Sequence, residues 1–175
     1  SIVLGEIIRR ASGLSADKFA ERYLFEPLGI TDYYWAKLPG ETVETGGGLF
    51  LRPRDMAKIG QLFLNDGRWQ GKQIVSENWV KESTVNHAGA MKNPAWLVAA
   101  DGYGYQWWLG SLKAASNDIR FYGARGRAGQ YVLVFPSLQM VAVFTGLNDN
   151  KLMNQPLDML QQYILPAVIA QNPKP

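Results

Sequence analysis

The chain has 175 residues, 47% of them hydrophobic, which suffices for one ordinary core or a large part of a bigger one. Its 18 basic and 15 acidic side chains leave a net charge of +3, too balanced to favour a nucleic-acid partner. The sequence contains no cysteine, which excludes disulfides and thiol catalysis, and its one histidine, His87, cannot supply a multi-histidine metal site. No apolar run approaches the roughly 20 residues that span a bilayer. We therefore expect no metal, no cofactor and no membrane span.

The first part of the chain, residues 1–101, is predicted to be mainly helical. Apolar side chains recur there at helical spacing, between residues that start and stop helices. The boundaries come from Ser12-Gly13, the N-cap candidate Ser15, Pro27-Leu-Gly29, Pro53, Asn65-Asp-Gly67 and Ser76. Residues 31–51, which contain Gly46-Gly47-Gly48, and residues 86–101 are expected to be irregular.

The second part, residues 102–175, is predicted to form antiparallel strands followed by a helix. Strands are expected at Tyr103–Leu109, Ile119–Tyr122, Tyr131–Phe135 and Met140–Thr145, the last two joined as a hairpin by Pro136-Ser137-Leu138. Because the last two strands lack polar alternation, both faces of the sheet should be covered. Pro156 opens the final helix and Pro166 is expected to end or kink it. Helices followed by strands and a covering helix indicate an α+β fold, both parts belonging to one larger domain.

The segment from Phe121 to Gln130 carries the strongest chemical signal. It places three glycines and two arginines at the mouth of the apolar strand that begins at Tyr131. Glycine allows a ligand or another backbone to come close, and a strand end is a rigid platform for N–H donors. This combination is typical of an oxyanion site, for which we single out Ala124, Arg125, Gly126 and Arg127.

Five sequence features in order resemble the C-terminal half of the serine β-lactamase and penicillin-binding protein superfamily. The likeness is greatest to the class C β-lactamase-like esterases, D-amino-acid peptidases and amide hydrolases. The features are Leu4-Gly-Glu-Ile-Ile8 with Ser12-Gly13, Phe25-Glu-Pro-Leu-Gly-Ile30, Gly47-Gly48 with Arg54-Asp-Met-Ala57, Tyr103-Gly-Tyr-Gln-Trp107, and the segment Gly126 to Pro136.

The resemblance implies a serine hydrolase that works through an acyl-enzyme on an ester, amide or peptide-like bond. It places the nucleophile and base motifs, Ser-x-x-Lys and Tyr-x-Asn, before Ser1, in a missing N-terminal half of the same protein. Ala124-Arg125-Gly126 then takes the position of the third motif, Lys-Thr-Gly or His-x-Gly, with the backbone N–H of Arg127 as an oxyanion donor. The resemblance also implies substrate contacts and favours a periplasmic or secreted location. The expected substrate-binding residues are Gly47, Gly48, Tyr105 and Trp107.

Other interpretations of the same residues stay open. Ser15-Ala-Asp-Lys18 matches Ser-x-x-Lys literally but fits a helix start with a solvent-facing lysine better. Arg125 and Arg127 can equally form a structural ion pair at a strand end. The fold can also serve as a non-catalytic cell-wall or peptide-binding module, an alternative that alanine at position 124 favours. Alone, the chain is expected to be catalytically silent, and an unpaired sheet edge would let it self-associate.

Overall fold

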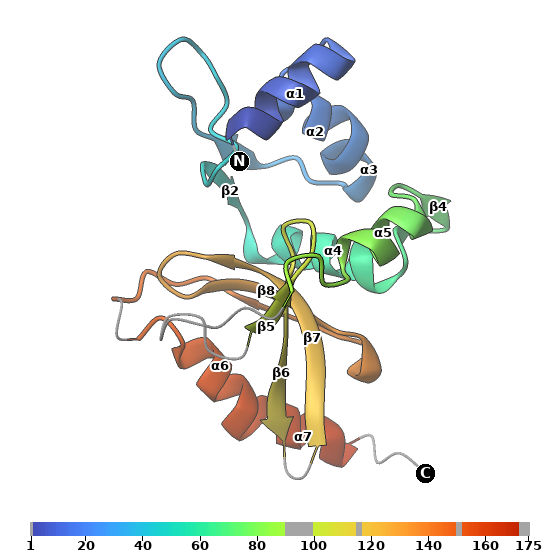
Figure 1. Ribbon diagram of the computed structural model, residues 1–175, viewed down its shortest axis with the longest axis vertical. Helices are drawn as coiled ribbons and strands as arrows, with labels where there is room; N and C mark the ends of the chain where they lie inside the picture. Colours follow the sequence, from blue (N-terminus) through green and yellow to red (C-terminus); the bar gives the residue numbers. More distant parts are fainter. Residues whose placement is uncertain (1, 90–99, 115–116, 150–151, 172–175) are drawn as a thin grey trace.

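The computed structural model describes residues 2–89, 100–114, 117–149 and 152–171, and Figure 1 shows their arrangement. Helical segments and a two-stranded ribbon make up the N-terminal end. The helices are α1 (Ile2–Ser12), α2 (Ala16–Ala20), η1 (Glu21–Phe25), α3 (Glu26–Leu28), α4 (Pro53–Leu64), α5 (Glu77–Ser83), η2 (Pro136–Leu138), α6 (Gln155–Met159), η3 (Leu160–Ile164) and α7 (Leu165–Gln171). The strands are β1 (Tyr33–Trp35), β2 (Leu49–Leu51), β3 (Arg68–Trp69), β4 (Lys72–Gln73), β5 (Ala100–Tyr103), β6 (Trp108–Ala114), β7 (Asn117–Gly126), β8 (Gln130–Phe135) and β9 (Met140–Phe144).

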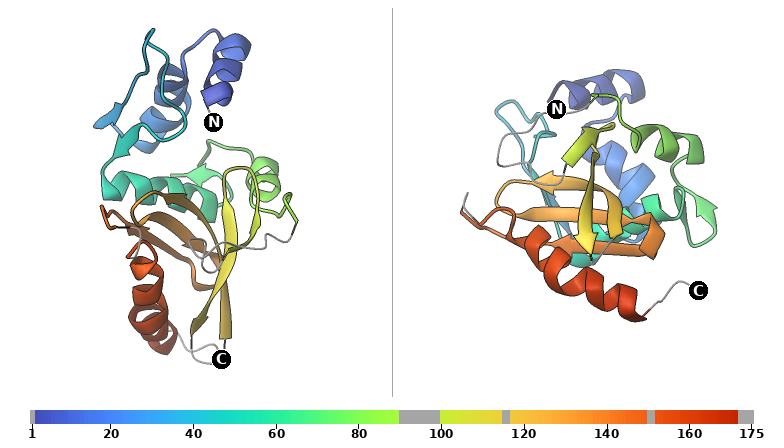
Figure 2. Two further views of the ribbon diagram at one scale, coloured as in Figure 1. Left: turned by 60° about the vertical axis from the view of Figure 1, so that its left-hand side comes forward. Right: turned by 60° about the horizontal axis from the view of Figure 1, so that its bottom comes forward.

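A five-stranded antiparallel sheet, in the order β5-β6-β7-β8-β9, forms the centre of the molecule. The continuous helical segment α6-η3-α7 covers one face, and α4 lies on the other (Figures 1 and 2). Two further ribbons, β1-β2 and β3-β4, are antiparallel pairs. This arrangement confirms the predicted α+β fold and the predicted β8-β9 hairpin.

The larger core lies between the sheet and its C-terminal helical cover. Alternate residues of β7 and β8 point into it, including Phe121 and Leu133. From the helical cover, Leu157, Leu160 and Leu165 reach the same cluster and are buried. Pro166 follows Leu165 without ending the helix, because a π-helical turn, η3, precedes it. Of the two outcomes expected at Pro166, a helix end or a kink, the helix end is therefore wrong.

Helix α4 packs closely against the opposite face of the sheet. A Cβ at Gly60 would lie 2.6 Å from Cγ1 of Val141 and 3.1 Å from Cγ1 of Val132. Only a residue without a side chain therefore fits where this helix crosses β8 and β9. Pro53 opens α4 at its first turn, as predicted.

The N-terminal helical segments enclose a second, smaller core. Phe25, Leu28, Ile30 and Leu62 are its buried members, and Trp35 packs against them. Gly29 ends α3 in the left-handed region at φ +62°, which accounts for the predicted stop at this glycine. By contrast, α1 buries none of its residues in the part of the chain that the structure describes.

Two sequence expectations about strands are corrected. Residues 103–109 do not form one strand: β5 ends at Tyr103, a turn follows, and β6 starts at Trp108. Within this turn, the Gly104 N–H donates to the Trp107 carbonyl at 2.8 Å. Residues 31–51 are not wholly irregular either, because β1 and β2 pair within them.

Some expectations fall outside the described residues. Most of the loop predicted over residues 86–101 lies outside the described residues. Its last two residues, Ala100 and Asp101, begin β5. Among the described helices, none combines the length and the apolarity that crossing a bilayer requires. The division of the chain at residue 101 stays a prediction.

Candidate functional site

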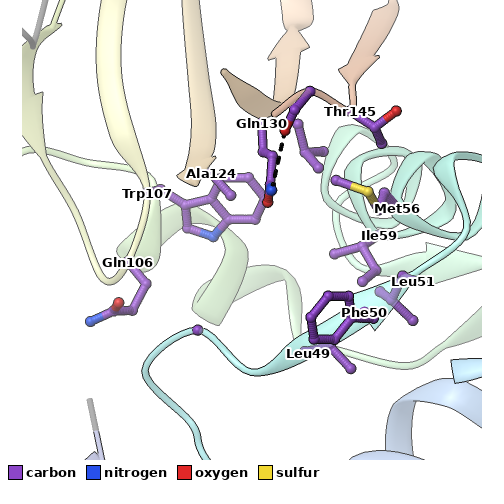
Figure 3. Close-up of a pocket in the computed structure, with 13 residues that line it drawn as sticks. Leu49, Phe50, Leu51, Met56, Ile59, Gln106, Trp107, Ala124, Gln130 and Thr145 are labelled. Atoms are coloured by element: carbon purple, nitrogen blue, oxygen red, sulfur yellow. Dashed lines mark hydrogen bonds between the residues drawn. The ribbon is translucent and has the colours of Figure 1, made fainter. Parts of the chain in front are cut away.

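A cavity of about 800 Å³ opens between α4, the β1-β2 ribbon and the ends of β7 and β8. Figure 3 shows Met56, Ile59 and the β2 side chains on one side and Trp107 and Ala124 on the other. The lining residues are Gly47, Leu49, Phe50, Leu51, Met56, Ile59, Gln106, Trp107, Ala124, Gln130, Val132, Thr145 and Gly146. Residues far apart in the sequence therefore build a single hollow.

The cavity lies beside the end of β7, where this strand extends beyond its neighbour β6. The last residue pair between β6 and β7 is Trp108 with Gly123, whereas β7 and β8 stay paired to Gly126 and Gln130. In the described residues, Ala124 to Gly126 therefore have a strand partner on the β8 side only. Ala124, the first residue past the end of β6, is exposed and lines the cavity. The strand end expected from the sequence thus borders a hollow.

The wall of this cavity is apolar and uncharged. Its polar side-chain groups are those of Gln106, Gln130 and Thr145 and the indole N–H of Trp107, and no ionisable side chain is among the lining residues described. The Gln130 amide donates to the Gly146 carbonyl at 3.5 Å, as the dashed line in Figure 3 shows. The described wall can therefore position a neutral ligand by shape and a few hydrogen bonds, but it supplies no acid or base.

Trp107 forms a fixed part of the wall. Its indole is 7% exposed and packs on Phe63, with ring centroids 4.5 Å apart. Tyr122 meets it edge-on at 5.4 Å. Burial raises the pKa of the Tyr122 hydroxyl far above its usual range, with a smaller contribution from Asp66. Tyr122 consequently stays protonated at neutral pH and is no candidate for a general base.

The structure brings some of the expected substrate-binding residues together and separates others. Gly47 and Trp107 line the cavity. Gly48 does not, and a Cβ there would lie 2.9 Å from the Cβ atoms of both Ala36 and Glu44, so its place is fixed by packing. Tyr105 also lies outside: its ring stacks on His87 at 4.3 Å.

The expected oxyanion residues point in different directions. Next to Ala124, which lines the cavity, Arg125 reaches the opposite side of the sheet. Its guanidinium donates to the Tyr131 hydroxyl and to the Asn154 side-chain oxygen, both at 3.2 Å. These contacts tie β7 to the start of the C-terminal helical cover. The role of Arg125 in an oxyanion site stays a prediction.

Gly126 and Arg127 lie at the turn between β7 and β8. A Cβ at Gly126 would come within 2.9 Å of the Gln130 side-chain oxygen, so glycine leaves room for that amide. Arg127 is exposed and borders a second hollow of about 430 Å³, which Gln130 shares with the cavity. The turn therefore places a cation near the cavity but outside it.

Several residues of the wall were not among the expected ones. Phe50, on the β1-β2 ribbon, is 63% exposed and packs against Tyr34 across the ribbon at 5.7 Å. Met56 and Ile59 come from α4, one helical turn apart. The helical spacing of apolar residues in the first part of the chain predicted buried helix faces, and only the position of α4 on the sheet turns this face into a cavity wall. In the described part of the chain, no three acidic or histidine side chains lie close enough to hold a metal ion.

Comparison with known proteins decides the family. The family model named Beta-lactamase matches residues 1–156. The chain belongs to the beta-lactamase family. Over 136 residues it is 29% identical to the 6-aminohexanoate-dimer hydrolase of Paenarthrobacter ureafaciens, a match that covers 69% of this chain and 32% of the relative.

Solved structures of other proteins share the fold of this chain. A Bacillus anthracis protein assigned as a 6-aminohexanoate-dimer hydrolase superposes with a TM-score of 0.76 at 22% identity, covering 99% of this chain and 43% of its own. The octameric penicillin-binding protein homologue of Pyrococcus abyssi gives a TM-score of 0.69 at 18% identity over 97% of this chain and 41% of its own. The chain thus spans less than half the length of these relatives. The predicted family and fold are confirmed, and the chain is related to hydrolases.

Proposed function

We propose that this chain forms one wall of the substrate cleft of a serine hydrolase that cleaves an amide, ester or peptide-like bond through an acyl-enzyme. In this proposal the nucleophile and its base come from polypeptide outside residues 1–175. The main observation in support of this proposal is the cavity at the end of β7, where β7 extends beyond β6 and Ala124 lines the cavity wall. Membership of the beta-lactamase family supports the same reaction class.

The strand end is well suited to hold the developing negative charge. In acyl transfer, the serine oxygen attacks the substrate carbonyl carbon while its proton passes to the base, and the carbonyl oxygen becomes an oxyanion. Backbone N–H groups at a rigid strand end stabilise that oxyanion without reorganisation. The amine or alcohol then leaves with a proton, and water hydrolyses the acyl-enzyme to the free acid. We assign the donor role to the Ala124–Arg127 segment.

A linear amide is the substrate class that we favour. The curated relative is named for hydrolysis of a dimer of 6-aminohexanoate, an amino acid with an unbranched hydrocarbon chain whose dimer is joined by an amide. The apolar, uncharged wall here suits such a chain, because Leu49, Phe50 and Ile59 can exclude water from methylene groups.

The proposal is tested with two proteins. The 175-residue chain alone is expected not to hydrolyse the 6-aminohexanoate dimer, p-nitrophenyl esters or nitrocefin. The complete polypeptide that carries this chain is expected to hydrolyse at least one of them. Turnover by the 175-residue chain that disappears when one of its own side chains is changed would contradict the proposed division of labour.

A non-catalytic binding module is the second candidate. The observation in its favour is that the described cavity wall contains no ionisable group and that Ala124 offers no polar side chain. Binding of linear amides by the complete polypeptide without any turnover would favour this candidate over the hydrolase.

A further inference from the structure

Gln106 has a backbone conformation that its residue type disfavours. Its φ is +67°, in the left-handed region where side chains with a Cβ are strained. Among the described residues, the other non-glycine positions with positive φ are Glu41, Asp66, Gln70, Ala128 and Gln139. Of this set, Gln106 alone lines the cavity. Glycine would adopt this conformation without strain, so the side chain at position 106 calls for an explanation.

Hydrogen bonds to residues near the end of α5 hold the turn that contains Gln106 in place. The Tyr105 N–H donates to the Ser83 carbonyl at 2.9 Å, which fixes the turn to the end of α5. A Cβ at Gly104 would lie 2.1 Å from that same carbonyl oxygen, so this close approach requires glycine. The preceding residue is also tied down, because the His87 N–H donates to the Tyr103 carbonyl at 2.9 Å. These contacts fix the three residues that precede Gln106 in the turn.

The Gln106 carboxamide is available to a ligand. It is exposed at the mouth of the cavity, beside the buried Trp107, and Figure 3 shows the carboxamide directed outward from the cavity. Within the part of the chain that the structure describes, it has no hydrogen-bond partner, whereas the Gln130 amide is already held by the Gly146 carbonyl. In a wall that is otherwise largely apolar, an unpaired carboxamide offers both a donor and an acceptor for orienting a neutral ligand.

We propose that Gln106 determines specificity by recognising the amide group of a linear substrate, its side-chain oxygen accepting a hydrogen bond from the substrate N–H. This inference rests on the proposed amide substrate. An ester has the same carbonyl but no N–H, so Gln106 would favour amides over the matching esters. A hydrogen bond of this kind changes affinity by roughly threefold to tenfold.

The experiment compares Gln106→Gly and Gln106→Ala with two matched controls, Gln70→Gly and Gln139→Gly. Both controls replace a glutamine at positive φ, 47° and 49°, in turns that do not line the cavity. Binding of N-butylhexanamide and of butyl hexanoate to the complete polypeptide that carries this chain is measured by NMR titration, in which any hydrolysis shows as separate product signals, and the melting temperature by calorimetry. Neither measurement depends on turnover, so failure of the proposed hydrolysis would be seen separately.

Stability and binding should change in opposite directions at position 106. Gln106→Gly is expected to raise the melting temperature by roughly 1–3 °C, because strain is relieved, and to weaken amide binding about threefold to tenfold with ester binding unchanged. Gln106→Ala should weaken amide binding equally, and both controls should gain stability without losing affinity. The inference is overturned if the unmodified polypeptide does not prefer the amide, if Gln106→Gly binds it undiminished, or if amide and ester weaken alike.

Discussion

Ala124 links the strand end to the cavity. It is the first residue of β7 beyond the end of β6, it is exposed, and its small side chain leaves the wall open. Had a large side chain stood here, it would have filled the space in which a ligand has to lie. The alanine that removes charge from the expected third motif therefore also creates room at the strand end.

Ala124→Leu tests this role. The added atoms would project into the cavity, so we expect the catalytic efficiency of the complete polypeptide to fall roughly tenfold to a hundredfold. Because the site is exposed, the free energy of unfolding should change by less than about 0.5 kcal/mol. Arg120→Leu, an exposed position on the same face of β7 outside the cavity lining, is the control and should keep full activity. Equal loss in both variants, or no loss in Ala124→Leu, would contradict the assignment.

At the scale of elements, the contact of α4 with the sheet positions one side of the cavity wall. Met56 and Ile59 face the cavity because Gly60, on the same helix, lets the backbone come close to β8 and β9. A larger residue there would force α4 away from the sheet and displace both side chains. The site thus depends on a glycine that takes no part in it.

Gly60→Ala is expected to lower the free energy of unfolding by about 1–3 kcal/mol, since the new methyl group would meet the stiff side chain of Val141. In an exposed helix interior the same change stabilises by up to about 1 kcal/mol. Chemical denaturation measures the difference. Val141→Ala removes the obstructing methyl groups, so the double variant should lose less than the sum of the two single losses. Strict additivity would show that Gly60 does not act through this contact.

The sequence predicted those features that local chemistry determines. Pro53 opens α4 and Gly29 closes α3, because fixed φ and left-handed φ are properties of the residues themselves. The turn after Tyr103 could not be predicted, since it depends on a hydrogen bond to Ser83, a residue distant in the sequence. For the same reason the sequence did not distinguish Trp107, which lines the cavity, from Tyr105, which stacks on His87 outside it.

At the scale of the whole molecule, two apolar features lack cover within the described residues. β9 is an edge strand with no partner on its outer side, and α1 leaves Val3 70% and Ile7 55% exposed. Exposed edges and apolar faces of this kind are typical of surfaces that other polypeptide covers. Since the chain spans less than half the length of its structural relatives, we propose that further polypeptide covers them. The expected self-association through an unpaired sheet edge stays a prediction.

The location of the acyl group is the most direct test of the proposed cleft. The measurement is a crystal structure of the complete polypeptide after reaction with an alkyl fluorophosphonate, which labels activated serines. We expect the label on a serine outside residues 1–175, with its alkyl chain in the cavity between Trp107, Ala124 and Phe50 and its phosphoryl oxygen at the end of β7. A label on a residue of this chain, or an alkyl chain outside the cavity, would contradict it.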